Sequence, residues 1–273
     1  MLARLLLPLL FVLGACTSAG DEPDAAPDRD EPVSTEPPAK GACRLLTAED
    51  IAQASNETEA VDCKDKHTAE TFAVGDFPAD IAGGVAGGVA GERIDDRALG
   101  AHVFESCETK FREFLGGNES LVMRATVTWA WFRPSQDAWD AGARWWRCDV
   151  VGGGEESTDL VDLPRTTKGI LLGRPHDRWM ACVDGPSVAE GSAKVACSEQ
   201  HTWRAVTTIV LGGGDEKYPG DDVVAARTRD FCSKSVGAWL NYPVEHEFGY
   251  TFFHEAEWKA GNRRSVCWAR TTQ

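Results

Sequence analysis

Cysteine is the feature that most limits what this chain can fold into. The 273-residue chain has nine cysteines, and one of them, Cys16, stands apart near the N-terminus. The other eight form two sets of four, namely Cys43, Cys63, Cys107 and Cys148, then Cys182, Cys197, Cys232 and Cys267. Successive separations are 20, 44 and 41 residues in the first set and 15, 35 and 35 in the second. Both sets therefore run short, long, long, which indicates an internal repeat.

Two short motifs recur in the same order and support this repeat. The pattern C-x3-H-T occurs at residues 63–68 and 197–202, and the pattern W-x2-G-x-R-x3-C occurs at residues 139–148 and 258–267. Besides cysteine, the matching residues are His67, Trp139, Gly142 and Arg144 in the first copy and His201, Trp258, Gly261 and Arg263 in the second. Chance agreement of both motifs is improbable, so we interpret the chain as two copies of one module.

The first fifteen residues are typical of an export signal. Residues 1–4 supply a positive charge, and residues 5–13 are nine apolar residues, fewer than the roughly 20 that cross a bilayer. The segment 13–16, Leu-Gly-Ala-Cys, resembles the bacterial lipobox, whose cysteine is acylated after cleavage. We therefore expect residues 1–15 to be a lipoprotein signal peptide and Cys16 to carry the lipid. The alternative is an ordinary signal peptide that contains a cysteine.

Amino-acid composition predicts the character of residues 16–40, and the net charge argues against nucleic acid and anionic lipid as partners. Residues 16–40 are rich in proline and acidic residues, cannot bury apolar surface, and are predicted to be a disordered tether. The formal net charge of the chain is −15. Nucleic acid requires a basic footprint that this chain lacks. The same charge argues against electrostatic docking on anionic lipid, so membrane association is assigned to the lipid anchor alone.

An exported, even set of cysteines predicts a disulfide framework. The repeat confines the pairs to each set of four, and the connectivity inside each set stays open. We favour first with second and third with fourth: Cys43–Cys63, Cys107–Cys148, Cys182–Cys197 and Cys232–Cys267. Zinc bound by the two C-x3-H motifs is the alternative. Oxidising export and the lack of a C-x2-C knuckle disfavour it, so we predict no metal and no cofactor.

Hydrophobic periodicity predicts the same order of elements in both halves. In the first half we expect a short helix opened by a capping box at residues 47–50, a helix at 92–115, and strands at 70–77, 121–132, 144–151 and 168–172. The glycine-rich stretch 81–91 is predicted to be a flexible surface loop. It does not resemble a phosphate loop, because no G-K-[ST] follows it.

In the second half we expect a helix at residues 221–240 and strands at 178–183, 201–211, 248–253 and 263–270. The predicted fold class is α+β, with two tandem small domains at 41–175 and 176–273. Each domain would be a mixed or antiparallel sheet with one main helix, and the third-to-fourth disulfide would pin that helix to the last strand.

The repeated histidines and tryptophans have structural and functional interpretations. His67 and His201 could serve acid–base chemistry, and we favour histidines fixed by a backbone carbonyl. Glu70 follows His67 by three residues, but Arg204 occupies the corresponding place, which weakens a catalytic pair.

The W-x2-G-x-R pattern is predicted to make a turn with positive φ at glycine and an arginine that stacks on tryptophan. A peptide or glycan groove is the alternative for this pattern. Trp129 and Trp131 are interpreted as core residues rather than a carbohydrate platform.

The combined order of these motifs resembles the septum formation domain family of actinobacterial cell-envelope proteins. The resemblance covers residues 41–151 and again 178–270. That family's strongest pattern is C-x2-P-H-x2-E, and here His67 and Glu70 match while Lys66 replaces the proline. In the second copy Gln200 and Arg204 replace the proline and the glutamate. The resemblance implies a link to division-septum or cell-wall processes without defining a reaction.

The sequence thus predicts a non-catalytic protein anchored by lipid to the outer face of the cell membrane. We expect it to bind another envelope component, either a protein or a wall polymer. One alternative is an exported cell-wall hydrolase that uses His67 and Glu70. The other is a lipoprotein that captures a substrate.

Overall fold

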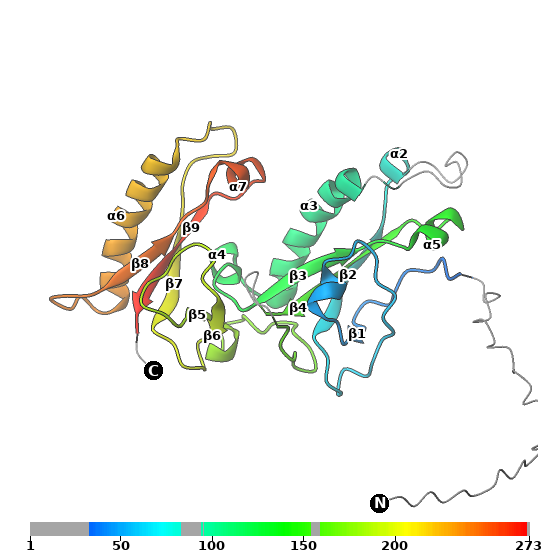
Figure 1. Cartoon of the computed structure of the whole chain (residues 1–273), viewed down its shortest axis with the longest axis horizontal. Coiled ribbons are helices and arrows are strands. Elements are labelled where there is room, and N and C mark those ends of the chain that lie inside the picture. Colours follow the sequence, from blue (N-terminus) through cyan, green and yellow to red (C-terminus); the bar gives the residue numbers. More distant parts are fainter. Residues whose placement is uncertain (1–32, 83–93, 95, 154–158, 272–273) are drawn as a thin grey trace, which may run out of the picture. The chain divides into compact units, whose positions relative to one another are not determined.

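The computed structural model describes residues 33–82, 94, 96–153 and 159–271. The signal peptide, most of the tether and the glycine-rich stretch from residue 83 onward lie outside these described residues. Val33–Gln273 forms one compact unit that contains two β-sheets. One long helix lies across each sheet (Figure 1). In the described residues, no helix is both long and apolar enough to cross a membrane.

The first sheet has the strand order β1-β2-β4-β3, and every pair of neighbours is antiparallel. Its strands are β1 (Cys43–Arg44), β2 (Ala69–Asp76), β3 (Val127–Phe132) and β4 (Trp145–Gly152). The long helix α3 (Asp96–Leu115) packs its apolar side on β2 and β4, where Phe72, Leu99, Val103 and Val150 are buried in one core. Four short helices complete this half: α1 (Ala48–Ile51), α2 (Ala79–Ala82), α4 (Glu119–Val122) and α5 (Gln136–Asp140).

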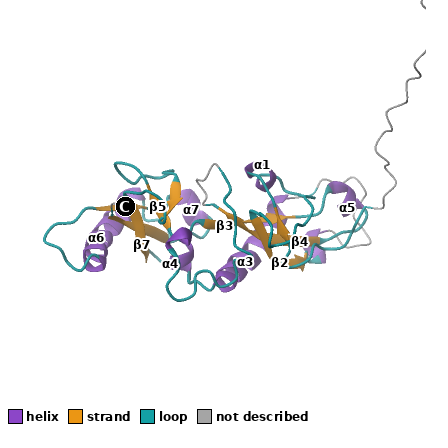
Figure 2. Cartoon of the chain, turned by 90° about the horizontal axis from the view of Figure 1, so that it is seen from below, coloured by secondary structure: helices purple, strands orange, loops and turns teal. Residues whose placement is uncertain are grey.

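The second sheet has the order β6-β5-β7-β9-β8 and is also antiparallel throughout. Its strands are β5 (Ala181–Val183), β6 (Lys194–Ala196), β7 (Trp203–Val210), β8 (Phe248–Thr251) and β9 (Arg264–Arg270). The long helix here is α6 (Asp221–Trp239), and a 3-10 turn η1 (Asp177–Trp179) and the helix α7 (Glu255–Lys259) are short. Figure 2 marks the helices and strands by colour, and the two antiparallel sheets together with these helices confirm the predicted α+β class.

The two sheets repeat each other in detail. The register of β2 against β4 shifts between Thr71 and Ala73, and that of β7 against β9 shifts between Ala205 and Thr207. Each shift lies four to six residues after the repeated histidine, so the extra residue of the bulge occupies the same place in both copies. Strand β3 pairs Trp131 with Cys148, and β8 pairs Tyr250 with Cys267. Residues 127–152 therefore correspond to residues 246–271 without a gap.

Most predicted elements are present, and their ends follow local capping. Thr47 opens α1 with the expected capping box, in which its side chain accepts from the Asp50 amide. Helix α3 ends at Gly116, whose φ of +74° suits glycine, and the amides of Gly116 and Gly117 both donate to Arg112. The predicted start of this helix at residue 92 lies outside the described residues.

Three strand predictions need correction. The predicted strand at 168–172 is wrong, because this segment is a turn that covers the end of α3, where Leu171 donates to the Leu115 carbonyl. The predicted strand at 121–132 begins only at Val127, since Asn118 caps the short helix α4 before it. The predicted strand at 178–183 begins as a 3-10 turn and becomes β5 at Ala181.

Several contacts join the two copies inside the compact unit. Ala125 and Met180 form an antiparallel bridge, and the Ala181 amide donates to the Arg124 carbonyl at 2.7 Å. The Arg124 guanidinium donates to the Val206 carbonyl on β7 at 2.9 Å. An ion pair of 2.7 Å links Arg264 to Glu119. The segment around α4 is thus the junction, while the predicted domain boundary at 175/176 stays a prediction.

Candidate functional site

Four disulfides connect the eight cysteines of the folded part, in the pairs favoured from the repeat: Cys43–Cys63, Cys107–Cys148, Cys182–Cys197 and Cys232–Cys267. The pair Cys107–Cys148 joins α3 to β4, and the pair Cys232–Cys267 joins α6 to β9. Each long helix is therefore fixed covalently to the strand that ends its copy. Disulfides of this kind form and persist in oxidising compartments, which places the folded part outside the cytoplasm.

The threonine of each C-x3-H-T motif clamps the strand that carries the first cysteine. The Thr68 hydroxyl donates to the Leu46 carbonyl at 2.7 Å and accepts from the Leu46 amide at 2.8 Å. The Thr202 hydroxyl donates to the Gly185 carbonyl at 2.6 Å and accepts from the Gly185 amide at 2.9 Å. Leu46 and Gly185 each lie three residues after the first cysteine of their copy. In each copy, the threonine thus holds the segment after the first cysteine by two hydrogen bonds.

The repeated histidines are buried and hold their own turns. The Nδ1 atoms of His67 and His201 lie 2.8 Å from the backbone oxygens of Asp65 and Glu199, respectively. Because a carbonyl oxygen only accepts, each Nδ1 carries the hydrogen. The exposed fractions of the two side chains are 1% and 2%, so neither imidazole can reach a substrate in solution. This geometry is the backbone-held arrangement that we favoured for both histidines.

Glu70 and Arg204 occupy corresponding positions in the two copies, and each bonds the segment that links the copies. Glu70 is buried, and its carboxylate accepts from the Thr166 hydroxyl at 2.7 Å and from the amide and hydroxyl of Thr167 at 2.5 and 2.6 Å. Arg204 donates to Asp177 at 2.6 Å, and this pairing with Arg204 lowers the pKa of Asp177. In the described residues no hydrogen bond joins His67 to Glu70, because the Glu70 carboxylate bonds Thr166 and Thr167 instead.

The W-x2-G-x-R pattern is a helix-ending turn held by a stacked arginine. Gly142 has a φ of +106°, and its amide donates to the Trp139 carbonyl at 3.0 Å. The guanidinium carbon of Arg144 lies 4.2 Å from the centre of the Trp139 ring, while Nη1 donates to the Trp139 carbonyl at 2.6 Å. The turn ends α5 and leads into β4, so these residues position the cysteine that follows.

The second copy repeats this turn at the end of α7. Gly261 has a φ of +102°, and its amide donates to Trp258 at 3.0 Å. The Arg263 guanidinium carbon lies 3.7 Å from the Trp258 ring centre, and Arg263 donates to the Trp258 carbonyl. Trp129 and Trp131 pack against the core beneath α3, as the core interpretation expects. Trp129, Trp131 and Trp139 are half-buried, and Trp258 is buried.

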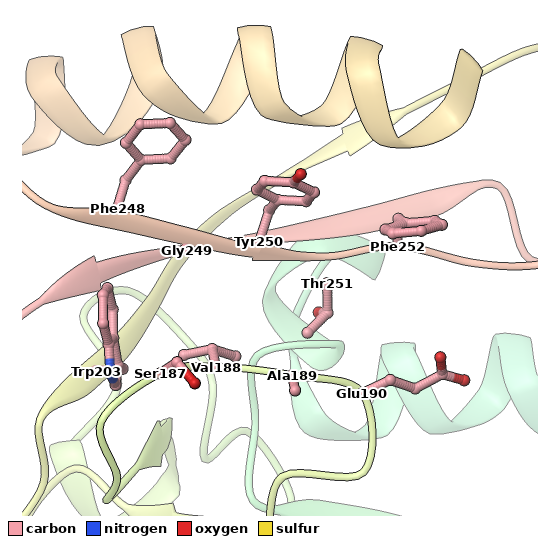
Figure 3. A pocket seen from close by; sticks show the side chains of 10 residues that line it. All are labelled: Ser187, Val188, Ala189, Glu190, Trp203, Phe248, Gly249, Tyr250, Thr251 and Phe252. Atoms are coloured by element: carbon pink, nitrogen blue, oxygen red, sulfur yellow. The ribbon is translucent and has the colours of Figure 1, made fainter. Parts of the chain in front are cut away.

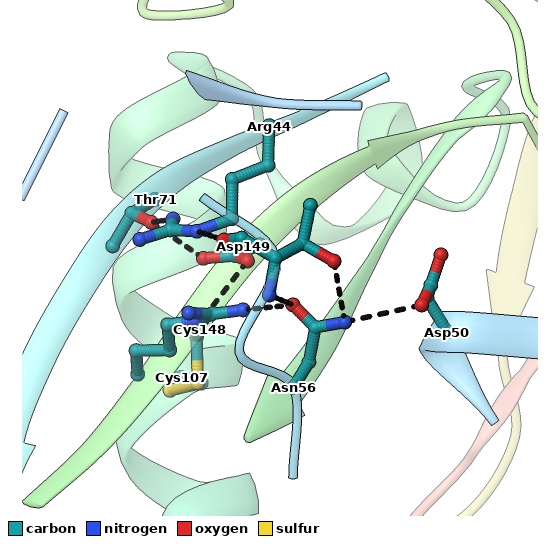
Figure 4. Close-up of polar contacts among 9 residues, drawn as sticks. Arg44, Asp50, Asn56, Thr71, Cys107, Cys148 and Asp149 are labelled. Carbon is teal, nitrogen blue, oxygen red and sulfur yellow. Dashed lines mark hydrogen bonds and ion pairs between the residues drawn. A yellow bond between two sulfur atoms is a disulfide. The ribbon is translucent and has the colours of Figure 1, made fainter. Parts of the chain in front are cut away.

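A buried ionic cluster distinguishes the first copy from the second. Arg147 and Asp149, with exposed fractions of 2% and 0%, form an ion pair of 3.2 Å on β4. Figure 4 shows the surrounding contacts, in which Thr71 donates to Asp149 at 2.7 Å and Arg44 donates to the Thr71 oxygen at 2.8 Å. Burial lowers the pKa of Arg147 to about 10, although Asp149 opposes this shift. Val266 and Trp268 replace Arg147 and Asp149 in the second copy, where this face is an apolar core.

A second titratable cluster lies at the surface of the second copy. His254 Nε2 is 2.8 Å from Glu190, and His254 Nδ1 is 3.0 Å from Asp221 at the start of α6. Hydrogen bonds to Glu190 and then to Asp221 raise the pKa of His254 above its ordinary value of 6.5. Tyr218 donates to Asp221, and burial together with this carboxylate raises the pKa of Tyr218 to about 12. A phenol with such a pKa stays protonated near neutral pH and holds the carboxylate in place.

Neither ionic cluster was predicted from the amino-acid sequence. The signal for the buried one was a charged pair inside the otherwise apolar strand segment 145–152, since charges in a buried strand need partners. The Glu190–His254–Asp221 cluster had no comparable signal, because its members lie far apart along the chain and belong to no repeated motif. In the described residues, no group of three His, Cys, Asp or Glu side chains is placed to hold a metal ion.

Comparison with known proteins adds one finding. A family model described as septum formation matches residues 40–267 of the chain. This range includes all eight paired cysteines and both copies of each motif. Neither the curated proteins nor the solved structures contain a match to the chain.

Proposed function

This chain belongs to the septum formation family, and from that premise we propose that it is a lipid-anchored binding protein of the cell envelope that acts without catalysis. It would be held by acyl chains on Cys16 at the outer face of the membrane. There it would bind another envelope component during septum or envelope organisation. The membership supports an association with cell division and the envelope, and the family is not known as an enzyme family.

The observation that supports a binding role is the use of the repeated polar residues inside the fold. His67 and His201 hold backbone turns, and Glu70 holds the linking segment. A general acid or base must reach the proton that it transfers. These three side chains are buried, and His67 Nδ1, His201 Nδ1 and the Glu70 carboxylate bond other parts of the fold, which supports a structural role for them. The four disulfides give the chain a cross-linked framework, which suits a binding role.

The anchor is tested by replacing Cys16. The full chain with Cys16→Ala, expressed with its signal, is compared with the unchanged chain and with Ser18→Ala as a matched control. We expect the Cys16→Ala protein in the soluble exported fraction and the other two in the membrane fraction, because only Cys16 can accept the acyl chains. Retention of all three proteins in the membrane fraction would contradict the anchor.

The division-related role is tested by localisation. We expect a fluorescent fusion at the C-terminus of the full chain to concentrate at division sites, and depletion of the protein to disturb septum placement or completion. The double variant His67→Gln and Glu70→Gln is the test of the hydrolase alternative. If this variant folds, and cells that carry it lose wall cleavage, the proposed non-catalytic role is wrong.

A further inference from the structure

The edge strand β8 of the second copy borders a cleft on the face where the first copy packs Leu46 and Ile51 against β3. The cleft has a volume of about 410 Å³ and lies between residues 187–190 and residues 248–252. Figure 3 shows Val188 and Trp203 on one side of β8, and Phe248 and Tyr250 on the opposite side. Phe248 and Tyr250 pack against the α6 core, so the cleft lies on the face away from that helix.

The first copy shows what occupies this place when the chain itself supplies the segment. There Ala130 and Phe132 on β3 pack with Leu46 and Ile51. The gap-free correspondence of the copies puts Gly249 and Thr251 at the places of Ala130 and Phe132, and Gly185 at the place of Leu46. Three side chains are thus smaller in the second copy, whereas Trp203, which lines the cleft, is larger than its counterpart Ala69. The first two cysteines are 15 residues apart rather than 20, and the loop between them places Val188 beside Gly249.

The first copy also shows how a segment pairs with this edge. Its own residues 54–56 run beside the end of β3, where Ser55 forms a parallel bridge with Arg133 and the Arg133 amide donates to the Ala54 carbonyl at 3.0 Å. The counterpart of Arg133 is Phe252, which borders the cleft. In the part of the second copy that the structure describes, no strand pairs with the outer edge of β8.

The backbone of β8 directs alternate N–H and C=O groups toward its outer edge. The Arg270 amide donates to the Glu247 carbonyl, so Glu247 and Arg270 form a hydrogen-bonded pair. Antiparallel pairs alternate, and therefore the N–H and C=O groups of Phe248 and Tyr250 point away from β9. An unpaired edge of this kind is a template for an added strand.

The charges at one end of the cleft indicate the character of the occupant. Glu190 lines the cleft, and its side chain is 70% exposed although it also bonds His254. Asp221, Asp222 and Glu255 border the adjoining hollow that His254 shares. A lysine or arginine on an incoming segment would pair with these carboxylates, whereas an acidic segment would be repelled.

From these observations we propose that the second copy binds an extended segment of a partner protein, which adds to β8 as a strand. The segment places an apolar side chain in the cleft beside Gly249, Thr251 and Val188 and a basic side chain at Glu190. This inference rests on the proposed binding role and names the class of partner. It assigns the strand-binding role to the second copy, because β3 and β8 are both edge strands but only the face of β3 is packed with Leu46 and Ile51.

The experiment uses the mature full chain and a library of random octapeptides displayed on phage. We expect the library to enrich peptides that alternate apolar residues and carry lysine or arginine. Selected synthetic peptides should bind at least tenfold more weakly to the double variant Gly249→Ala and Thr251→Phe, which restores the side chains of the first copy. An alanine Cβ at position 249 meets Val188 at 3.5 Å, an ordinary contact. Thr251→Phe removes the acceptor of the Trp268 indole N–H, so an unchanged circular dichroism spectrum is required of the double variant.

Two further measurements separate strand addition from other modes of binding. Val244→Phe is the matched control, because it adds a ring at a fully exposed position and should leave affinity unchanged. Glu190→Gln should weaken basic peptides more than neutral ones. Bound peptide should also slow hydrogen exchange of the Phe248 and Tyr250 amides.

The proposal is overturned if no peptide is enriched, if the cleft-filling variant binds within twofold of the unchanged protein, or if exchange of the two amides is unaffected. Binding of purified wall polymer at this cleft in place of peptides would likewise overturn it. Septal localisation that persists while no peptide binds would reject this inference and leave the proposed function standing. Peptide binding without septal localisation would reject the proposed division-related role and leave this inference standing.

Discussion

At the level of single residues, corresponding positions of the two copies make the same contacts, even where the residue types differ. Thr68 and Thr202 make the same clamp with the same residue type. Glu70 and Arg204 have opposite charges, yet both hold the linking segment through hydrogen bonds. A carboxylate suits threonine donors and a guanidinium suits an aspartate acceptor, so the side chain at each position matches the group that it meets in its own copy.

Gly261 should be sensitive to the smallest substitution. Its φ of +102° is rarely adopted by residues with a Cβ, although nothing lies within 4 Å of the place where that atom would be. We expect Gly261→Ala to lower the free energy of unfolding by about 1 to 3 kcal/mol, measured by urea denaturation. Gly214→Ala is the control, since Gly214 also has open space and has no strained φ, and it should change stability by less than about 0.5 kcal/mol. Equal effects of the two variants would refute this explanation.

His254 should make part of the stability depend on pH. Its bonds to Glu190 and Asp221 raise its folded pKa above 6.5, so its contribution is fully present below that ordinary value and is lost as pH rises through the folded pKa. The side chain is 36% exposed, and screening keeps the effect small. We expect the stability difference between the unchanged protein and His254→Gln to shrink from about pH 6 to about pH 9.

The measurement is urea unfolding at several pH values, together with an NMR titration of the His254 ring. Glu190→Gln should bring the midpoint of that titration back toward the ordinary value, because it removes the largest cause of the shift. A stability difference that grows with pH would contradict the assigned sign.

At the level of elements, each copy is an antiparallel sheet whose long helix is bonded by a disulfide to its last strand in sequence. The helix face that carries Cys107 and Cys232 is the face that packs on the sheet, so both disulfides are buried in the core. The first-to-second disulfides instead join a sheet strand to the segment before the C-x3-H-T clamp. The two kinds of cross-link therefore close loops of very different length.

The disulfides should stabilise the fold in the order of the loops that they close. Cys107–Cys148 closes 41 residues and Cys182–Cys197 closes 15. In the chain-entropy description these contribute about 4 and about 3 kcal/mol, respectively. We expect the double alanine variant of the first pair to lose more free energy of unfolding than that of the second, measured by urea denaturation. The opposite order would show that native-state packing outweighs loop entropy.

Many elements could be predicted from the sequence because their signals are local. Apolar residues recur every three to four positions in α3 and α6, and the capping box at Thr47 marks α1. The turn at residues 168–171 could not be predicted, because its conformation follows from bonds to the end of α3 some fifty residues earlier. Its apolar residues resemble a strand, but they cover a helix end.

At the scale of the whole molecule, the copies are joined directly as well as through the chain. Arg124 donates to the Val206 carbonyl, and burial lowers the pKa of this arginine. Arg264 pairs with Glu119 across the same junction. A desolvated guanidinium that bonds a carbonyl of the other sheet makes the two copies energetically dependent on each other.

The unfolding of the two copies should therefore be coupled. We expect one calorimetric transition for the mature protein, and two separated or broadened transitions for Arg124→Met with Arg264→Met. Arg229→Met is the control, since Arg229 is exposed and pairs only with the adjacent Asp230 in the described structure. Two transitions in the unchanged protein would show that the junction does not couple the copies.

The duplicated frame is visible in the amino-acid order alone, because cysteine spacing and the two repeated motifs are properties of order along the chain. The amino-acid order also identified the septum formation family and the α+β class, both of which are confirmed. The tertiary structure decided what the motif residues bind and how the copies differ. Glu70 meets a threonine 97 residues away, Thr71 meets an aspartate 78 residues away, and β8 is left beside an open cleft. Such contacts depend on how distant segments are brought together in space, which a local pattern does not encode.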